Sequence, residues 1–254
     1  FRLTGENVAD VARICAWLDG LPLAIEIAAA QVKWRAPNLL YAQLRDRLEA
    51  LTGGPRDLSP RQQSLRGALD WSFDLLDETE KRLFSLLGIF SGGCAQEAIL
   101  EAHGLVFDAS EEEDRIEIFK TKLRGLVEKS LLQHELAPDG AARYVMLETM
   151  RDYARDQLEA RGEMERAQAW HCEYYLNFAK AIRPNLIQGG EQAQWLSLVE
   201  REHNNLRAAL EWAIASRRAA QAMELGWALH PFWTGRSYIS ERRAWLKKIL
   251  ALDP

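Results

Sequence analysis

The residue types that most often catalyse reactions or bind metals are present in this sequence, but not at the spacings that such sites need. The five histidines are scattered along the chain, whereas zinc sites bring His and Cys ligands in close pairs. The segment Glu128-Lys129-Ser130 ends like a phosphate loop but lacks its glycines. Neither a Gly-x-Ser-x-Gly nucleophile segment nor a His-Glu-x-x-His metal segment occurs. We therefore expect no catalytic residue and no metal site, and we predict that the chain is not an enzyme by itself.

Three basic side chains in one predicted helix, 116–129, offer a different chemistry. Lys120, Lys122 and Arg124 could neutralise DNA phosphates, as a recognition helix must. Residues 108–130, however, contain seven acidic residues against five basic ones. This charge balance favours a helix that packs within the protein, so that DNA binding by this chain is the less favoured reading. Lys120, Lys122 and Arg124 are its candidate contacts.

A β-hairpin is predicted directly after this helix. Residues 131–136 alternate loosely, Pro138-Asp139-Gly140 is typical of a turn, and 141–145 form a second β-rich run. It is the only clear β structure that the sequence predicts, and an isolated hairpin is marginal in water. It must therefore lie on helices, and helices followed by one hairpin are typical of a winged helix-turn-helix. We place this winged-helix domain at residues 64–162.

Two local patterns indicate how the winged helix is built. Asp77 is predicted to cap the helix 78–90, with Glu80 three residues later completing a capping box. Ser91-Gly92-Gly93 is predicted to end that helix. In the helix 116–129, the apolar spacing predicts a buried face that begins at Ile116 and continues through Phe119.

The flanking segments are predicted to be helical as well. Residues 1–52 form a small helical domain of three helices, with Pro22 in the first turn of the second one. The glycines and prolines of 53–63 indicate a linker. Residues 163–254 resemble the start of a tetratricopeptide-like superhelix. They hold six of the nine tryptophans, which we predict to pack between helices: Trp170, Trp195, Trp212, Trp227, Trp233 and Trp245. The predicted fold class is therefore mainly α: a small helical domain, a winged-helix domain with one β-hairpin, and a tetratricopeptide-like α superhelix.

The composition of the chain limits its possible partners and cellular compartment. A net charge of −5 argues against a general nucleic-acid or membrane-surface protein. No apolar run reaches the roughly 18–20 residues of a membrane span, no signal peptide is recognised, and the three cysteines form no bridge pattern. We expect a cytoplasmic protein without membrane partners. No methionine precedes Met146, and we interpret the chain as a piece of a longer protein.

Three segments together resemble one family of signalling proteins. They are Leu18–Glu26, which contains Gly-Leu-Pro-Leu-Ala, then Arg56–Ser72, and Met146–Ala154. In this order they are similar to the STAND-type ATPases related to NB-ARC proteins, which include large bacterial LuxR-like and SARP-like transcriptional regulators. The resemblance spans nearly the whole chain.

The resemblance implies the regulatory part of an ATP-dependent switch. The nucleotide-binding domain would lie upstream and would be a partner of this chain, so that ATP or ADP is bound in the full-length protein and no cofactor in this segment. Pro22 matches the proline that contacts the nucleotide base. The winged helix would fold back on the nucleotide and hold the ADP state, and a ligand or protein bound to the superhelix would release it. Nucleotide state would thereby be coupled to transcriptional control.

One position departs from the family. Many relatives carry Met-His-Asp at the end of the wing, and the histidine contacts the ADP phosphate. Here Met146-Leu147-Glu148 stands in its place, and a leucine donates no hydrogen bond. Arg151 or Arg143 is the candidate substitute.

Two other functions stay open at the level of sequence. One is a winged-helix DNA-binding transcriptional regulator, and the other is a helical-repeat module that binds a peptide or a small molecule. The sequence names neither the sensed ligand, nor the effector domain, nor the oligomeric state.

Overall fold

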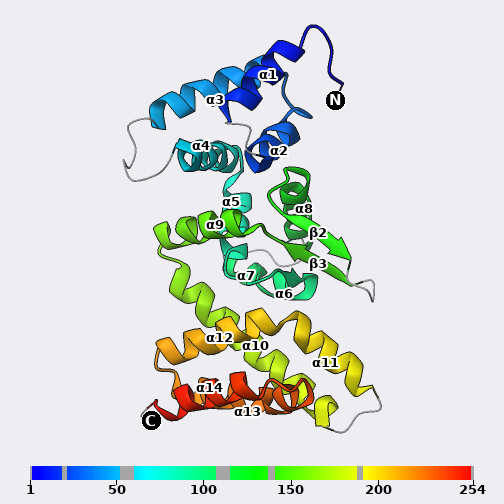
Figure 1. The fold of residues 1–254 in the computed structure, drawn as a ribbon, viewed down its shortest axis with the longest axis vertical. Coiled ribbons are helices and arrows are strands. Elements are labelled where there is room, and N and C mark those ends of the chain that lie inside the picture. The colour runs from blue at the N-terminus through cyan, green and yellow to red at the C-terminus, as the bar shows by residue number, and fades with distance from the viewer. Residues whose placement is uncertain are drawn as a thin grey trace. The chain divides into compact units, whose positions relative to one another are not determined.

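The computed structural model describes residues 2–18, 22–51, 60–106, 115–136, 141–187 and 191–252 (Figure 1). Most of them are helical, which confirms the predicted mainly α class. The chain divides into two compact units. The first contains Phe1–Gly88 and His103–Gln157, and the second contains Ile89–Ala102 and Leu158–Pro254. The predicted hairpin turn and most of the predicted linker lie outside the described residues, and residues 60–63 of that linker already belong to a helix.

The first unit begins with four helices around one apolar core. They are α1 (Val8–Trp17), α2 (Pro22–Gln31), α3 (Pro37–Leu51) and α4 (Pro60–Asp74). Small and aliphatic side chains from all four meet there: Ile14, Leu18, Ala24, Ala28, Leu40, Leu44, Ala68 and, as the one aromatic residue of this set, Trp71. Because α2 contributes alanines, its neighbours can approach closely. Pro22 is the first residue of α2, as predicted, and α4 shares a core with the helices before it.

The winged-helix part of the first unit follows α4. It contains α5 (Glu78–Leu87), α7 (His103–Val106), α8 (Arg115–Glu128), β2 (Gln133–Leu136), β3 (Ala142–Val145) and all but the last three residues of α9 (Glu148–Ala160). β2 and β3 pair antiparallel, with Gln133 opposite Val145. The predicted helices, hairpin and following helix are therefore confirmed. Ile116 corrects one detail, because it is 45% exposed and the buried stripe of α8 begins only at Phe119.

An aromatic cluster joins α4 to the winged helix. The ring centre of Phe73 lies 5.8 Å from that of Phe84 and 5.7 Å from that of Tyr153. The Tyr153 hydroxyl donates a 2.7 Å hydrogen bond to Oδ1 of Asp70. Burial and this bond raise the pKa of Tyr153, so the hydroxyl remains a donor. α4 thus packs on the N-terminal helices with one face and on α5 and α9 with another.

The second unit is a set of stacked helices. It contains β1 (Cys94–Ala95), α6 (Gln96–Glu101), α10 (Met164–Ile187), α11 (Gln192–Arg201), α12 (His203–Ala215), α13 (Ala219–Gly235) and α14 (Ile239–Leu250). β1 was not predicted, so the hairpin is not the only β structure of the described residues. The turns 216–218 and 236–238 both close with a 2.8 Å backbone bond across the helix end, Arg218 to Ala213 and Tyr238 to Trp233. Likeness to tetratricopeptide repeats stays a prediction.

The tryptophans of this unit do not all pack between helices. Trp233 is buried, as predicted, with 1% of its surface exposed. For Trp227 the prediction was wrong, because 57% of its surface is exposed. The guanidinium carbon of Arg183 lies 3.6 Å from the ring centre of Trp227, so this tryptophan is covered by a cation rather than by a helix.

A buried polar cluster fastens the segment Ile89–Ala102 to the helices of the second unit. Asn205 is fully buried. Its Oδ1 accepts a 2.7 Å hydrogen bond from the Ser91 backbone, and its Nδ2 donates to the Gly93 carbonyl and to Glu202, each over 2.8 Å. Gly92 and Gly93 have φ of +74° and +82°, which glycine adopts without strain. The predicted helix 78–90 ends earlier than expected, at Leu87, and the glycine turn follows after three further residues. One side chain holds both ends of that turn.

Replacing Asn205 by leucine should therefore loosen the turn. The Ser91 N–H and the Gly93 carbonyl lose their buried partner, and we expect unfolding to cost about 2–4 kcal/mol less. Urea unfolding measures the loss, and hydrogen exchange of the Ser91 amide reports the local opening. Asn177→Ala is the matched control, because Asn177 is exposed on α10 and its loss should cost less than about 0.5 kcal/mol. Equal effects of the two substitutions would contradict the assigned role.

Candidate functional site

The solvent face of α8 is the candidate recognition surface of the winged helix. Glu117, Thr121, Arg124 and Glu128 are exposed and follow one another at helical spacing, so they form one stripe. Lys120 lies beside them, with 38% of its side chain exposed. Two carboxylates and two cations leave this surface without net charge.

Lys120 and Arg124 of α8 contact the same carboxylate. Nζ of Lys120 lies 3.7 Å from Oε2 of Glu117, and Nη2 of Arg124 lies 3.4 Å from Oε1. Such exposed pairs contribute at most about 1 kcal/mol, so a phosphate could replace Glu117 as the partner at little cost. The i,i+3 spacing of Glu117 and Lys120 could have indicated the first pair from the sequence.

Lys122, the third predicted DNA contact, lies against the start of α5. Its ammonium forms an ion pair with Asp77, whose side chain caps α5 by accepting a 2.9 Å bond from the Glu80 N–H. The Glu80 carboxylate accepts a hydrogen bond from the Asp77 N–H, which confirms the predicted capping box. Partial burial alone would raise the pKa of Asp77, but the hydrogen bonds from Lys122 and the Glu80 N–H outweigh it and hold this pKa below its usual value. The bond to Asp77 in turn raises the pKa of Lys122.

A second ion pair, between Lys129 and Glu80, also joins the end of α8 to the capping box of α5 and is more buried than the first. Nζ of Lys129 lies 2.6 Å from Oε1 of Glu80, whose side chain is only 8% exposed. A Cβ at Gly125 would lie 3.0 Å from the same oxygen, so the glycine lets α8 approach the capping box. Lys122 and Lys129 therefore position α8 on α5. We name these two lysines with Asp77 and Glu80 the α5–α8 clasp.

The wing adds little charge to this surface. All four residues of β2 are exposed, and Leu136 has 70% of its surface in solvent. Glu135 stands opposite Arg143 in the hairpin, and the ring of His134 lies 5.0 Å from that of Tyr144. Among the described residues of β2 and β3, one carboxylate and one guanidinium balance each other.

The residues implied by the nucleotide-switch resemblance lie in the first unit. Pro22 is exposed at the start of α2. Leu147 lines a narrow cleft together with Glu26 of α2, so the end of the wing and α2 are neighbours. Arg151 pairs with Glu148 on α9, and 18% of its side chain is exposed. The nucleotide roles of Pro22 and Arg151 stay predictions, as does the substitute role of Arg143 in β3.

Two further searches cover the described residues only. No group of three or more His, Cys, Asp or Glu side chains there is arranged to hold a metal ion. In the same part of the chain, no helix combines the length and the apolar character needed to cross a membrane.

The clasp makes stability depend on pH in a defined way. Asp77 has a folded pKa below 3.8, so its contribution is present above about pH 4 and is lost as pH falls further; Lys122, with a pKa above 10.5, loses its contribution as pH rises past that value. Lys122→Met should cost about 0.5–1 kcal/mol at neutral pH, because both groups are partly exposed. The cost should shrink at about pH 3, as urea unfolding at both pH values would measure.

Lys33→Met is the control for this substitution, because Lys33 is an exposed lysine outside the clasp. It should change stability little at either pH. A cost of Lys122→Met that is the same at acid and neutral pH would contradict the ion pair.

Comparisons with known proteins agree with this geometry. A family model described as "Winged helix-turn-helix domain" matches residues 76–159. Proteins of Mycobacterium tuberculosis and Mycobacterium bovis, each named "Putative HTH-type transcriptional regulator", are 37% identical over 98% of this chain, which spans 27% of their length. An uncharacterized protein of Mycobacterium tuberculosis is 31% identical over 65% of this chain, and the match covers 40% of that protein. No solved structure matches.

The comparisons bear differently on the functions that the sequence left open. They fit a winged-helix transcriptional regulator better than an ATP-dependent switch, which they do not show. The matched range contains the clasp, α8 and the hairpin. Residues 76–159 therefore form a winged helix-turn-helix domain, in a chain that is similar over nearly its whole length to mycobacterial proteins named as HTH-type regulators.

Proposed function

We propose that the chain is part of a transcriptional regulator, and that its winged helix makes a weak DNA contact through α8. The observation that carries the proposal is the outward face of α8, where Lys120 and Arg124 pair with the exposed carboxylate of Glu117. The similarity to proteins named as HTH-type regulators supports it. The chain spans 27% of the length of these proteins. That the whole protein regulates transcription is therefore proposed here as well.

The charges of the domain limit how strong this contact can be. Lys122 is engaged by Asp77, and Glu117 and Glu128 would face the phosphates together with Lys120 and Arg124. At most three phosphates can be neutralised by Lys120, Lys122 and Arg124. Each phosphate contributes a slope of about −0.9 in log K against log salt concentration. The main affinity for DNA must then come from elsewhere in the regulator.

A duplex titration tests this proposal. Fluorescence anisotropy with a labelled duplex should detect binding at low salt, with a slope no steeper than about −2.7. Between about 50 and 200 mM salt the affinity should fall by no more than about 40-fold. Lys120→Ala/Arg124→Ala should reduce the slope by roughly 2 and weaken binding to all sequences alike.

Arg243→Ala/Lys247→Ala is the matched control, since it also removes two exposed cations but from α14 in the other unit. It should leave duplex binding unchanged. The proposal fails if no duplex binding is detected at low salt, or if the α8 and α14 variants weaken binding equally.

A nucleotide-coupled switch is the second candidate function. The cleft that Leu147 and Glu26 of α2 line together favours it. The end of the wing and the start of α2, to which the resemblance assigns nucleotide sensing, are therefore neighbours in one compact unit. In this function the winged helix would dock on an upstream nucleotide-binding domain. Pro22 would contact the nucleotide base, ATP or ADP would be bound there, and the second unit would sense a ligand or a protein.

The chain by itself should hydrolyse no ATP under this second function. It has no Gly-x-x-x-x-Gly-Lys segment to cradle phosphates. Phosphate release from ATP, measured with purified chain, should equal the buffer blank. Turnover that rises with protein concentration and persists after further purification would contradict the assignment of Pro22 to a site shared with another domain.

A further inference from the structure

Glu117 holds a central position among the charges on the outward face of α8. It lies in the first turn of the helix, and 67% of its side chain is exposed. Its two carboxylate oxygens face different cations, Oε2 toward Lys120 at 3.7 Å and Oε1 toward Arg124 at 3.4 Å. A single side chain therefore sets the electrostatic state of the two residues to which the proposed DNA contact is assigned.

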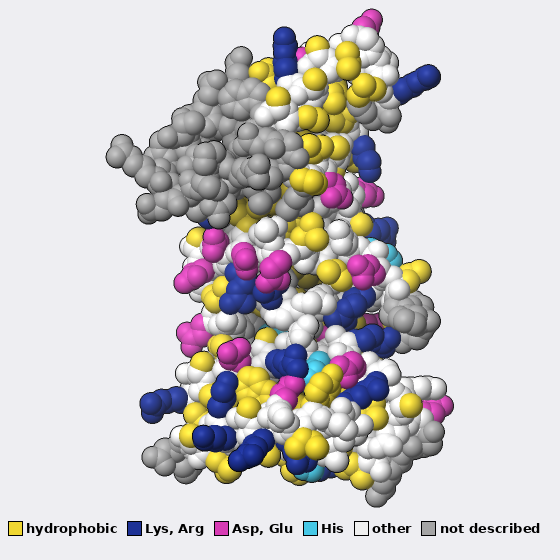
Figure 2. All heavy atoms as spheres, in the orientation of Figure 1, with side chains coloured by type: hydrophobic (Ala, Val, Ile, Leu, Met, Phe, Trp, Pro, Cys, Tyr) yellow, Lys and Arg dark blue, Asp and Glu magenta, His cyan; other side chains and the backbone are white. Residues whose placement is uncertain are grey.

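The charges around this face are mixed rather than uniformly basic. In Figure 2, acidic and basic side chains lie beside one another over the winged-helix part of the chain. Such a surface attracts phosphates weakly, so the affinity that does not depend on sequence is low. A contact of this kind can gain from base edges what it lacks in phosphate neutralisation.

Glu117 and the DNA phosphates compete for the same two cations. If Lys120 and Arg124 move to phosphates, the Glu117 carboxylate loses both ion pairs while the approaching duplex removes it from water. A carboxylate left without a partner in an interface is strongly unfavourable, and a neighbouring phosphate repels it. Close binding through α8 therefore requires a new hydrogen-bond donor for Glu117 on the DNA.

The amino group of cytosine is the donor in the major groove that suits a carboxylate best. Guanine presents the acceptors N7 and O6 there, and thymine presents the acceptor O4 and a methyl group. Adenine has an amino group, but its N7 acceptor lies beside that group and would repel the carboxylate. In recognition helices the N-terminal residues meet the base edges, and Glu117 is in the first turn of α8.

We propose that Glu117 is the specificity-determining residue of the DNA contact. It lowers the affinity for every sequence by holding Lys120 and Arg124, and the affinity is restored where a cytosine amino group binds its carboxylate. The inference rests on the proposed function and names the kind of duplex that α8 selects. A purely structural Glu117, which stabilises the first turn of α8 by its negative charge, would not respond to base sequence.

Three labelled duplexes of equal length test the inference, with alternating A·T pairs, alternating G·C pairs and alternating inosine·cytosine pairs. Inosine lacks the minor-groove amino group of guanine, so the third duplex keeps the cytosine amino group in the major groove but has a minor groove like that of A·T pairs. Fluorescence anisotropy with the whole chain at low salt should give about tenfold tighter binding to both cytosine duplexes than to the A·T duplex.

Glu117→Gln should remove this preference, because it keeps the shape of the side chain and removes its charge. Lys120 and Arg124 then become available to phosphates, so binding to the A·T duplex should become about three- to tenfold tighter. The ratio between the duplexes should fall below about twofold. A misfolded variant cannot imitate this result, since binding to one duplex has to increase.

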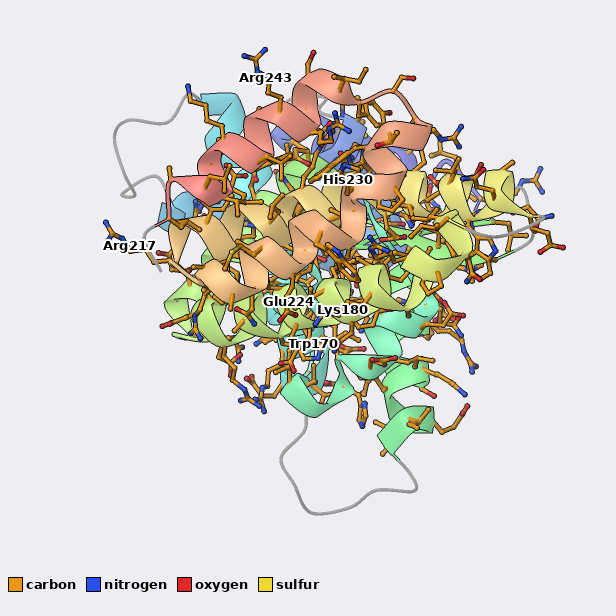
Figure 3. The ribbon with its side chains drawn as sticks, turned by 90° about the horizontal axis from the view of Figure 1, so that it is seen from below. Trp170, Lys180, Arg217, Glu224, His230 and Arg243 are labelled. Atoms are coloured by element: carbon orange, nitrogen blue, oxygen red, sulfur yellow. The ribbon has the colours of Figure 1, made fainter. Side chains whose placement is uncertain are left out.

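Two matched substitutions remove a carboxylate elsewhere. Glu128→Gln removes the same charge from the other end of the exposed stripe of α8. Glu224→Gln removes an exposed carboxylate of the second unit that pairs with Lys180, and Figure 3 shows these two side chains close to one another. Both variants should keep the roughly tenfold preference for the cytosine duplexes.

The outcomes separate this inference from the proposed function. Absence of binding to all three duplexes at low salt overturns both. Binding that requires Lys120 and Arg124 but is equal for the three duplexes overturns the inference alone, and so does a preference that Glu117→Gln retains. Tighter binding to the G·C duplex than to the inosine·cytosine duplex would place the contact in the minor groove and would also overturn it.

Discussion

The α5–α8 clasp is the interaction on which the candidate site depends. Lys122 of α8 and Lys129, the residue directly after it, pair with two carboxylates at the start of α5, and these carboxylates also form the capping box of α5. This arrangement orients α8 and also removes Lys122 and Lys129 from its outer surface. A helix with a basic sequence therefore presents a face with no net charge. A DNA contact through that face is expected to be weak, because among the α8 side chains that the structure describes, Lys120 and Arg124 are the exposed cations left to meet phosphates.

In the second unit, the buried side chain of Asn205 fixes the backbone of one turn. Asn205 holds the turn at Ser91 and Gly93, although that turn falls within the range matched by the winged-helix family model. The winged-helix sequence is thus divided between two compact units. A change in the helices around Asn205 would act on the segment that follows α5, so the two units are linked through the chain itself.

Much of the fold could be predicted from local patterns. Pro22 and the Asp77–Glu80 capping box follow rules of helix termini that need no tertiary information, and the hairpin follows from its alternation and turn residues. The candidate site could not be predicted in the same way, because the partners of Lys122 and Lys129 lie 45 and 49 residues away in sequence. The exposure of Trp227 and Ile116 likewise depends on which neighbours cover each helix. Periodicity alone does not contain that information.

The central proposal is that DNA contacts this chain mainly through α8, with the hairpin beside it. Backbone chemical shifts of the chain, followed by NMR while a short duplex is added at low salt, test it most directly. The account predicts that the largest changes fall on the amides of Glu117, Thr121, Arg124 and Glu128, with smaller ones in the hairpin. Largest changes on α14, or changes of equal size in both units, would contradict it.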